Sequence, residues 1–190
     1  MRIITGSARG IALQTLEGEV TRPTPAVVKE AIFSSIQFDI EGRTMLDLFA
    51  GSGQMGLEAL SRGAAKCTFV DGNKDATNII TANAKKAKLY PQCNVLCMDW
   101  EQYIRSAAKR SSFDIVFLDP PYADALVPKV LCELFDSDMI KDTSLIICES
   151  GEKLDTDNVM ISERYNVKKE ARYGRVYVTY FTPKTEETDE

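Results

Sequence analysis

The sequence of 190 residues contains no histidine. Mechanisms that need an imidazole base, including the Ser-His-Asp and Cys-His arrangements of many hydrolases, are therefore excluded. Metal sites with histidine ligands are excluded for the same reason. The five cysteines are an odd number, contain no Cys-x-x-Cys pair and lie in apolar segments, so they are interpreted as reduced core residues. We expect no bound metal.

Long apolar runs are also absent. No stretch approaches the roughly 18 residues that indicate a membrane span. The opening Met1–Gly6 has neither the apolar region nor the small-residue cleavage site of an export signal. Hydrophobic residues make up 44% of the chain and charged residues 27%, which is typical of globular proteins. We expect a cytoplasmic monomer without a membrane partner.

Positive charge is scarce. The net charge of -5 argues against a nucleic-acid partner, because phosphate binding depends on lysine and arginine. However, the stretch 182–190, expected to be a disordered tail, holds one lysine against four acidic residues. Basic residues outnumber acidic ones in 1–29, which predicts a modest RNA-contact patch, with solvated surface positions as the alternative. The predicted contacts are Arg2, Arg9, Arg22 and Lys29.

The N-terminal part predicts a β-hairpin followed by a helix. Residues 2–5 and 11–16 are β-prone and flank a glycine-containing turn with Arg9 near its tip. Thr24 is the expected cap of a helix over about 25–37. Its apolar positions fall on one face: Val28, Ile32, Phe33 and Ile36.

From residue 44 onward, strand and helix patterns alternate. Strands are predicted at 45–48, 66–71, 93–97, 113–118 and 143–148, and helices at 53–62, 74–88, 100–108 and 124–136. This alternation predicts an α/β fold with a doubly wound, mostly parallel sheet. Two further runs, 159–168 and 173–181, predict an antiparallel pair at one sheet edge, joined by 169–172. We expect one domain over 1–190, with an extension at 1–43 and a core at 44–181.

The tetrapeptide Asp119-Pro120-Pro121-Tyr122 follows the predicted strand 113–118 directly. The Asp119 carboxylate and the Pro120 carbonyl can both accept hydrogen bonds from an exocyclic amino group, and the Tyr122 ring can stack on a planar base. The alternative is a simple stop signal, because proline cannot continue a ladder of hydrogen bonds.

A glycine loop, Asp47 to Gly56, follows the first strand of the alternating part and opens a helix. Its glycines match the G-x-G-x-x-G spacing, and Asp71 ends the next strand, where a carboxylate can bind ribose hydroxyls. Asp47 would repel a pyrophosphate but attract the ammonium or sulfonium of S-adenosylmethionine. A structural acceptor for loop N–H groups is the alternative for Asp47. Asp99 can accept from an adenine amino group and Trp100 can cover the ring, unless Asp99 is a helix cap.

In this order, these motifs resemble those of the S-adenosylmethionine-dependent amino-methyltransferases. With the opening Met1–Gly6 and the segment Arg22–Thr24, the chain resembles the bacterial RsmD family, which methylates guanine N2 in 16S ribosomal RNA. The resemblance implies a Rossmann-like fold and catalysis at Asp119, Pro120 and Tyr122. It further implies cofactor contacts from Asp47, Phe49, Gly51, Gly53 and Asp71, with Asp99 on the adenine. Because the chain is weakly basic, we expect its substrate to be 16S rRNA within an assembling small subunit.

Three other functions remain possible at this point. An adenine-N6 methyltransferase acting on DNA or RNA would use the same acceptors beside the target amino group. A nicotinamide-binding oxidoreductase would use the glycine spacing and Asp71. A ribosome-assembly factor would keep the fold without catalysis.

Overall fold

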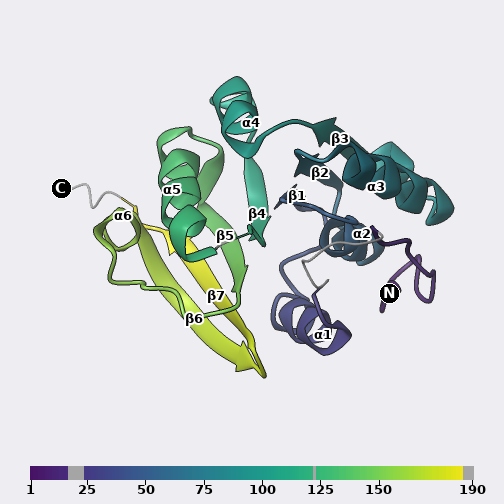
Figure 1. Ribbon diagram of the computed structural model, residues 1–190, viewed down its shortest axis with the longest axis horizontal. Coiled ribbons are helices and arrows are strands. Elements are labelled where there is room, and N and C mark those ends of the chain that lie inside the picture. Colours follow the sequence, from purple (N-terminus) through teal and green to yellow (C-terminus); the bar gives the residue numbers. More distant parts are fainter. Residues whose placement is uncertain (17–23, 122, 186–190) are drawn as a thin grey trace. The chain divides into compact units, whose positions relative to one another are not determined.

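The computed structural model describes residues 1–16, 24–121 and 123–185. The chain divides into two compact units, Met1–Tyr103 and Ile104–Glu190, which are described separately (Figure 1). In the described ranges, no helix has the length and apolar character that crossing a membrane requires. Each unit contains parallel strands connected through helices.

The first unit is built on three parallel strands in the order β3-β2-β1. Its elements are α1 (Ala26–Ser35), β1 (Thr44–Leu48), α2 (Gln54–Ser61), β2 (Lys66–Asp71), α3 (Lys74–Lys86), the 3-10 turn η1 (Tyr90–Gln92), β3 (Cys93–Cys97) and the start of α4 (Trp100–Ala107). Cys67 pairs with Met45 on one side and Cys93 on the other. The carboxyl ends of parallel strands lie at the same edge, so the loop after β1 lies beside Asp71 at the end of β2.

The second unit contains a parallel pair followed by an antiparallel pair. Its elements are β4 (Phe113–Leu118), α5 (Ala123–Asp136), β5 (Ile140–Ser150), α6 (Val159–Ser162), β6 (Tyr165–Tyr173) and β7 (Val176–Pro183). Their order is β4-β5-β7-β6, with β4 parallel to β5 and the other pairs antiparallel. Figure 1 shows β6 and β7 as a long ribbon that reaches well past α6.

The predicted strands 66–71, 93–97 and 113–118 are confirmed at their predicted bounds. The predicted antiparallel pair at one sheet edge is confirmed, but the predicted start of its first strand at 159 is wrong. Residues 159–162 form a helix whose N-cap, Asn158, accepts a hydrogen bond from the Met160 N–H at 3.0 Å. The predicted joining segment 169–172 is also wrong, since β6 continues to Tyr173 and the chain turns at Gly174, which has a φ of 66°. The charged residues of β6 do not give the apolar pattern of a strand, but an exposed edge strand tolerates them.

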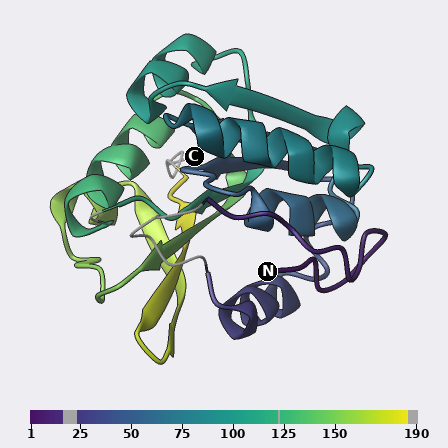
Figure 2. The ribbon, with the colours of Figure 1, turned by 45° about the vertical axis from the view of Figure 1, so that its right-hand side comes forward.

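The predicted N-terminal hairpin is present as a narrow loop (Figure 2). A single antiparallel bridge joins Arg2 to Ala12, and the Ile3 N–H donates to the Ile11 carbonyl at 3.0 Å. The prediction that Thr24 caps the next helix is wrong. Pro25 is the N-cap of α1, because its carbonyl accepts the first helical bond, from the Val28 N–H at 2.9 Å.

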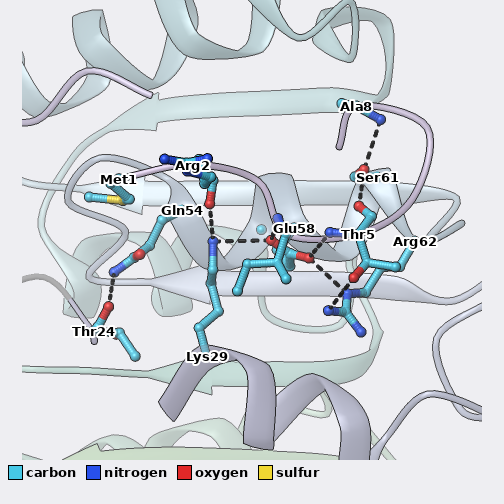
Figure 3. Close-up of polar contacts among 12 residues, drawn as sticks. Met1, Arg2, Thr5, Ala8, Thr24, Lys29, Gln54, Glu58, Ser61 and Arg62 are labelled. Carbon is cyan, nitrogen blue, oxygen red and sulfur yellow. Dashed lines mark hydrogen bonds and ion pairs between the residues drawn. The ribbon is translucent and has the colours of Figure 1, made fainter. Parts of the chain in front are cut away.

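The Glu58 carboxylate holds this N-terminal loop against α2 (Figure 3). It is fully buried and accepts hydrogen bonds from the N–H groups of Ile4, at 2.8 Å, and Thr5, at 3.0 Å. It also pairs with Lys29 Nζ at 3.0 Å and with Arg62 Nε at 2.9 Å. Burial opposes the charge, but the Ile4 and Arg62 hydrogen bonds and the Lys29 charge lower the pKa of Glu58 below its ordinary value. Four donors therefore stabilise one buried anion.

Lys29 cannot contact RNA phosphate as the sequence suggested. Its side chain is 1% exposed, and its ammonium also donates to the Arg2 carbonyl at 2.8 Å. Burial lowers the pKa of Lys29, while the neighbouring Glu58 carboxylate opposes this effect. Lys29 is therefore a buried structural residue that ties α1 to the N-terminal loop, and it is withdrawn from the RNA-binding residues.

Glu58→Gln is expected to lower the free energy of unfolding by about 3–5 kcal/mol, because Lys29 would become an unpaired buried charge. Lys29→Met is expected to cost less, since Glu58 keeps the donors from Ile4, Thr5 and Arg62. Urea denaturation at pH 7 measures both variants. An equal or larger loss for Lys29→Met would contradict this account.

The same variants predict a pH dependence. The folded-state pKa of Glu58 is below its ordinary 4.5, so its stabilisation is complete above that value and is lost as the pH falls through the folded-state pKa. The difference in stability between the native chain and Glu58→Gln is therefore expected to narrow in acid.

Candidate functional site

The loop after β1 has an unusual backbone. Phe49, Gly51 and Gly53 have φ values of 72°, 53° and 75°, in the left-handed region. Glycine adopts this region without strain, but phenylalanine does not. The N–H groups of Phe49 and Ala50 both donate to the Val70 carbonyl at 3.0 Å, which holds the strained turn against β2. Backbone strain of this kind is concentrated at functional sites.

Packing also requires the glycines in this loop and in α2. A Cβ on Gly56 would lie 2.3 Å from the Phe69 ring, so α2 approaches β2 as closely as glycine allows. A Cβ on Gly53 would meet the Ile80 side chain at 3.1 Å. The glycines therefore bring α2 and α3 against the loop, with the first turn of α2 directly after Gly53.

Asp47 is buried in β1, and its carboxylate accepts a hydrogen bond from the Gly56 N–H at 2.9 Å. This contact corresponds to the structural alternative, in which Asp47 satisfies N–H groups near the loop. The carboxylate lowers the cost of an unpaired N–H in the first turn of α2. An interaction of Asp47 with a cationic cofactor stays a prediction.

Asp71 is attached to the glycine loop by both of its carboxylate oxygens. One accepts from the Gly51 N–H at 2.8 Å, and the other accepts from the Asn73 N–H at 2.8 Å. Each carboxylate oxygen has more than one lone pair, so these bonds leave acceptor capacity for hydroxyl groups. Asp71 is therefore oriented at the end of β2 in the way that ribose recognition would require.

Asp99 and Trp100 lie at the start of α4. The Asp99 carboxylate accepts from the Glu101 N–H at 2.8 Å, so the helix-cap interpretation describes the observed contact. The Trp100 ring lies 6.4 Å from the Phe49 ring, centroid to centroid, at an interplanar angle of 46°. The structure thus brings Trp100 to the strained loop, a contact that the sequence did not reveal.

Asp119 and Pro120 follow β4 in the second unit. Asp119 is half-buried and Pro120 is buried. Burial raises the pKa of Asp119 to about 6, so its carboxylate is held in an environment that disfavours charge. The predicted stacking residue, Tyr122, lies outside the described residues.

The predicted RNA contacts lie in different environments. Arg2 and Arg9 are exposed, Lys29 is buried, and Arg22 lies outside the described residues, as does the end of the acidic tail.

The N-terminal loop carrying Arg2 and Arg9 follows α2 from end to end. The Gln14 N–H donates to the Asn83 side chain at 2.8 Å, and Asn83 donates to the Ser52 carbonyl in the glycine loop at 3.1 Å. At the other end of α2, the Ser61 hydroxyl accepts from the Ala8 N–H at 2.9 Å. A helix of 8 residues is about 12 Å long. Because Arg9 follows Ala8 at the far end of α2, it lies roughly 12 Å from the glycine loop.

Comparison with known proteins identifies the family. The family model described as "Conserved hypothetical protein 95" matches residues 1–182. Ribosomal RNA small subunit methyltransferase D of Haemophilus influenzae is 34% identical over 178 residues, which is 93% of this chain and 90% of that protein. The chain belongs to the RsmD family. It is a methyltransferase.

Further comparisons agree with this family and its fold. A Bacillus subtilis protein named "Putative rRNA methyltransferase YlbH" is 38% identical over 156 residues, 82% of this chain and 85% of that protein. The solved structure named "Putative methyltransferase yhhF from Escherichia coli" has a TM-score of 0.84 and 29% identity, covering 97% of this chain and 98% of that one. The predicted Rossmann-like methyltransferase fold is therefore confirmed, and the family argues against the oxidoreductase alternative.

Two residues with clear roles in the structure were missed at the level of sequence. Glu58 was passed over because a glutamate in a helix is normally solvent-exposed. Gln54 occupies an unspecified position of the G-x-G-x-x-G spacing, so that motif assigns it no role. It is 6% exposed, and its amide nitrogen donates to the Thr24 carbonyl at 3.4 Å. The sequence feature that could have identified Glu58 and Gln54 is their position in the helix directly after the glycine loop.

Binding of S-adenosylhomocysteine is expected to change the fluorescence of the chain. Trp100 is the single tryptophan and lies beside Phe49 in the strained loop, so emission reports directly on this region. Titration should give a saturable change, and Asp71→Ala should weaken it because Gly51 and Asn73 lose their acceptor. Lys66→Ala, an exposed change at the other end of β2, serves as the control. If Asp71→Ala binds S-adenosylhomocysteine with unchanged affinity, Asp71 is not a cofactor-binding residue.

Proposed function

We propose that this chain, an rRNA methyltransferase of the RsmD family, transfers the methyl group of S-adenosylmethionine to the exocyclic N2 amine of a guanine in 16S rRNA. The observation that carries the proposal is the acceptor pair after β4, formed by the Asp119 carboxylate and the Pro120 carbonyl. An exocyclic amine offers two N–H donors, and two acceptors can hold both. The family relationship supports the choice of guanine over adenine.

The protein's contribution to the reaction is mainly positioning. The lone pair of the guanine amine is delocalised into the ring, and hydrogen bonds to Asp119 and the Pro120 carbonyl favour a more tetrahedral, nucleophilic nitrogen. Bound S-adenosylmethionine supplies an electrophilic methyl group on its sulfonium. Ionised Asp119 offers two acceptor oxygens and a negative charge, whereas its protonated form would turn one oxygen into a donor. Tyr122 would stack on the flipped or unpaired base. A histidine base is not needed.

On the cofactor side, we assign the ribose to Asp71 and the close backbone approach to the loop of Phe49, Gly51 and Gly53. Asp99 would accept from the adenine amine while it caps α4, and Trp100 would cover the ring. Asp47 would support the loop through its hydrogen bond to Gly56 and add negative charge near the sulfonium. The polar residues present therefore fit S-adenosylmethionine.

RNA contact is proposed for Arg2, Arg9 and Arg22. This set is weakly basic, and it is smaller without the buried Lys29, so the shape of the RNA and ribosomal proteins would have to assist binding. The proposed substrate is therefore an assembling small subunit. Turnover on small-subunit particles is expected to exceed turnover on protein-free 16S rRNA, as measured by transfer of radiolabelled methyl groups. Comparable turnover on both would count against this substrate.

Asp119→Asn is expected to reduce methyl transfer by about 100-fold or more, because the amide offers one acceptor oxygen in place of two and carries no negative charge. The affinity for S-adenosylhomocysteine should stay unchanged. Since burial disfavours the ionised carboxylate, the same variant should raise the thermal midpoint at pH 7. Lost transfer with lost stability would instead indicate misfolding.

The same assay gives a pH profile. A folded-state pKa of about 6 for Asp119 means that kcat/KM should rise with pH through that value and then level off. Asp119→Asn should lack this rise. Mass analysis of the reacted nucleosides identifies the product, and N6-methyladenosine in place of N2-methylguanosine would favour the adenine alternative.

A further inference from the structure

Gln54 contains a buried polar atom without a partner. The side chain is 6% exposed, and its Oε1 is the single buried side-chain oxygen or nitrogen among the described residues that has no hydrogen-bond partner. A buried acceptor of this kind costs free energy in folding, and native proteins contain few of them. Such an atom therefore calls for a donor that no other residue in 1–16, 24–121 or 123–185 supplies.

The direction of the amide follows from its other contact (Figure 3). Gln54 Nε2 donates to the Thr24 carbonyl at 3.4 Å. A carbonyl can only accept, so the opposite orientation of the amide would place two acceptors against each other. Oε1 is therefore the atom left for an outside donor.

The position of Gln54 restricts what that donor can be. Gln54 follows Gly53 directly and is the first residue of α2. Asp47 takes the Gly56 N–H of this turn, and the partial positive charge of the helix end favours a carboxylate beside the other N–H groups of the turn. A ligand that offers a carboxylate to this turn and an N–H donor to Oε1 carries both groups close together. The α-carboxylate and α-ammonium of an amino acid satisfy this requirement on one carbon atom.

We propose that Gln54 Oε1 accepts a hydrogen bond from the α-ammonium of the methionine part of S-adenosylmethionine. The proposal rests on the cofactor assigned above and adds a residue that recognises its amino-acid end. Gln54 then connects the cofactor to Thr24 through its two amide atoms, because Nε2 stays bound to the Thr24 carbonyl. Gln54 is thus a specificity-determining residue for cofactors that keep the amino group.

The test compares two ligands that differ in one group. S-Adenosylhomocysteine has the α-ammonium, and its deaminated analogue, with a thiobutanoate chain, lacks it. Calorimetry gives the affinity of both for the native chain, Gln54→Met and Gln54→Glu. Gln37→Met is the matched control, since Gln37 is exposed and lies outside the glycine loop.

Gln54→Met is expected to lower the affinity for S-adenosylhomocysteine by about 10-fold, because a hydrogen bond to a charged group is lost. The affinity for the deaminated analogue should be unchanged. Gln54→Glu keeps an acceptor for the amino group but loses the Nε2 donor to the Thr24 carbonyl, so it should retain the ligand preference with lower thermal stability. Gln37→Met should match the native chain.

Thermal unfolding of each unliganded variant establishes that it is folded. If neither Gln54 variant is folded, the native chain provides the test, because the proposal requires it to bind S-adenosylhomocysteine more tightly than the deaminated analogue.

Two results would overturn the proposal. If Gln54→Met lowers the affinity for both ligands equally, Gln54 only packs against the glycine loop. Unchanged affinity for both would show that Oε1 meets water and not the cofactor. Failure of S-adenosylhomocysteine to bind the native chain would instead overturn the assigned cofactor, so the two failures are distinguishable.

Discussion

The buried carboxylate of Glu58 is the interaction on which the first unit depends. It connects α2 with the N-terminal loop through two backbone N–H groups and with α1 through Lys29. An isolated buried charge would be too costly, and four donors around one anion remove that cost. Because α2 begins at the glycine loop, the same carboxylate attaches the proposed RNA-contact loop to the helix that carries the cofactor site. The proposed RNA-contact loop and the glycine loop are therefore both joined to α2.

The glycine loop uses a comparable principle on the cofactor side. Its left-handed residues are strained or glycine, and the carbonyl of Val70 and the carboxylate of Asp71 satisfy the loop's N–H groups. The loop is therefore pre-shaped before any ligand binds, which reduces the ordering cost of binding. Gln54 is the exception, since its Oε1 is buried without a partner. If this atom faces the cofactor, as proposed, the site favours a ligand that supplies a hydrogen-bond donor to Gln54 Oε1.

Much of the fold could be predicted from the sequence. Runs such as 66–71 and 113–118 are apolar, β-prone and bounded by polar loop residues, so their bounds depend on local pattern alone. The antiparallel pair at the sheet edge was also predictable, but the bounds of β6 were not, because its charged residues give no apolar alternation and an exposed edge strand tolerates them. The candidate site was predictable where glycines and strand-end carboxylates carry it, at Gly51, Gly53 and Asp71. The contact of Trp100 with Phe49 joins residues distant in the chain and leaves no local signal.

The sequence by itself determined the type of chemistry. It excluded imidazole catalysis, placed acceptors after β4 and a glycine loop after β1, and carried the family resemblance that the comparisons confirmed. Tertiary structure alone decided which charges are buried and which face solvent. Lys29 and Arg9 are both basic residues of the N-terminal part, but Lys29 meets a buried carboxylate and Arg9 does not. Burial depends on what packs around a side chain, and residues far apart in the chain supply those neighbours.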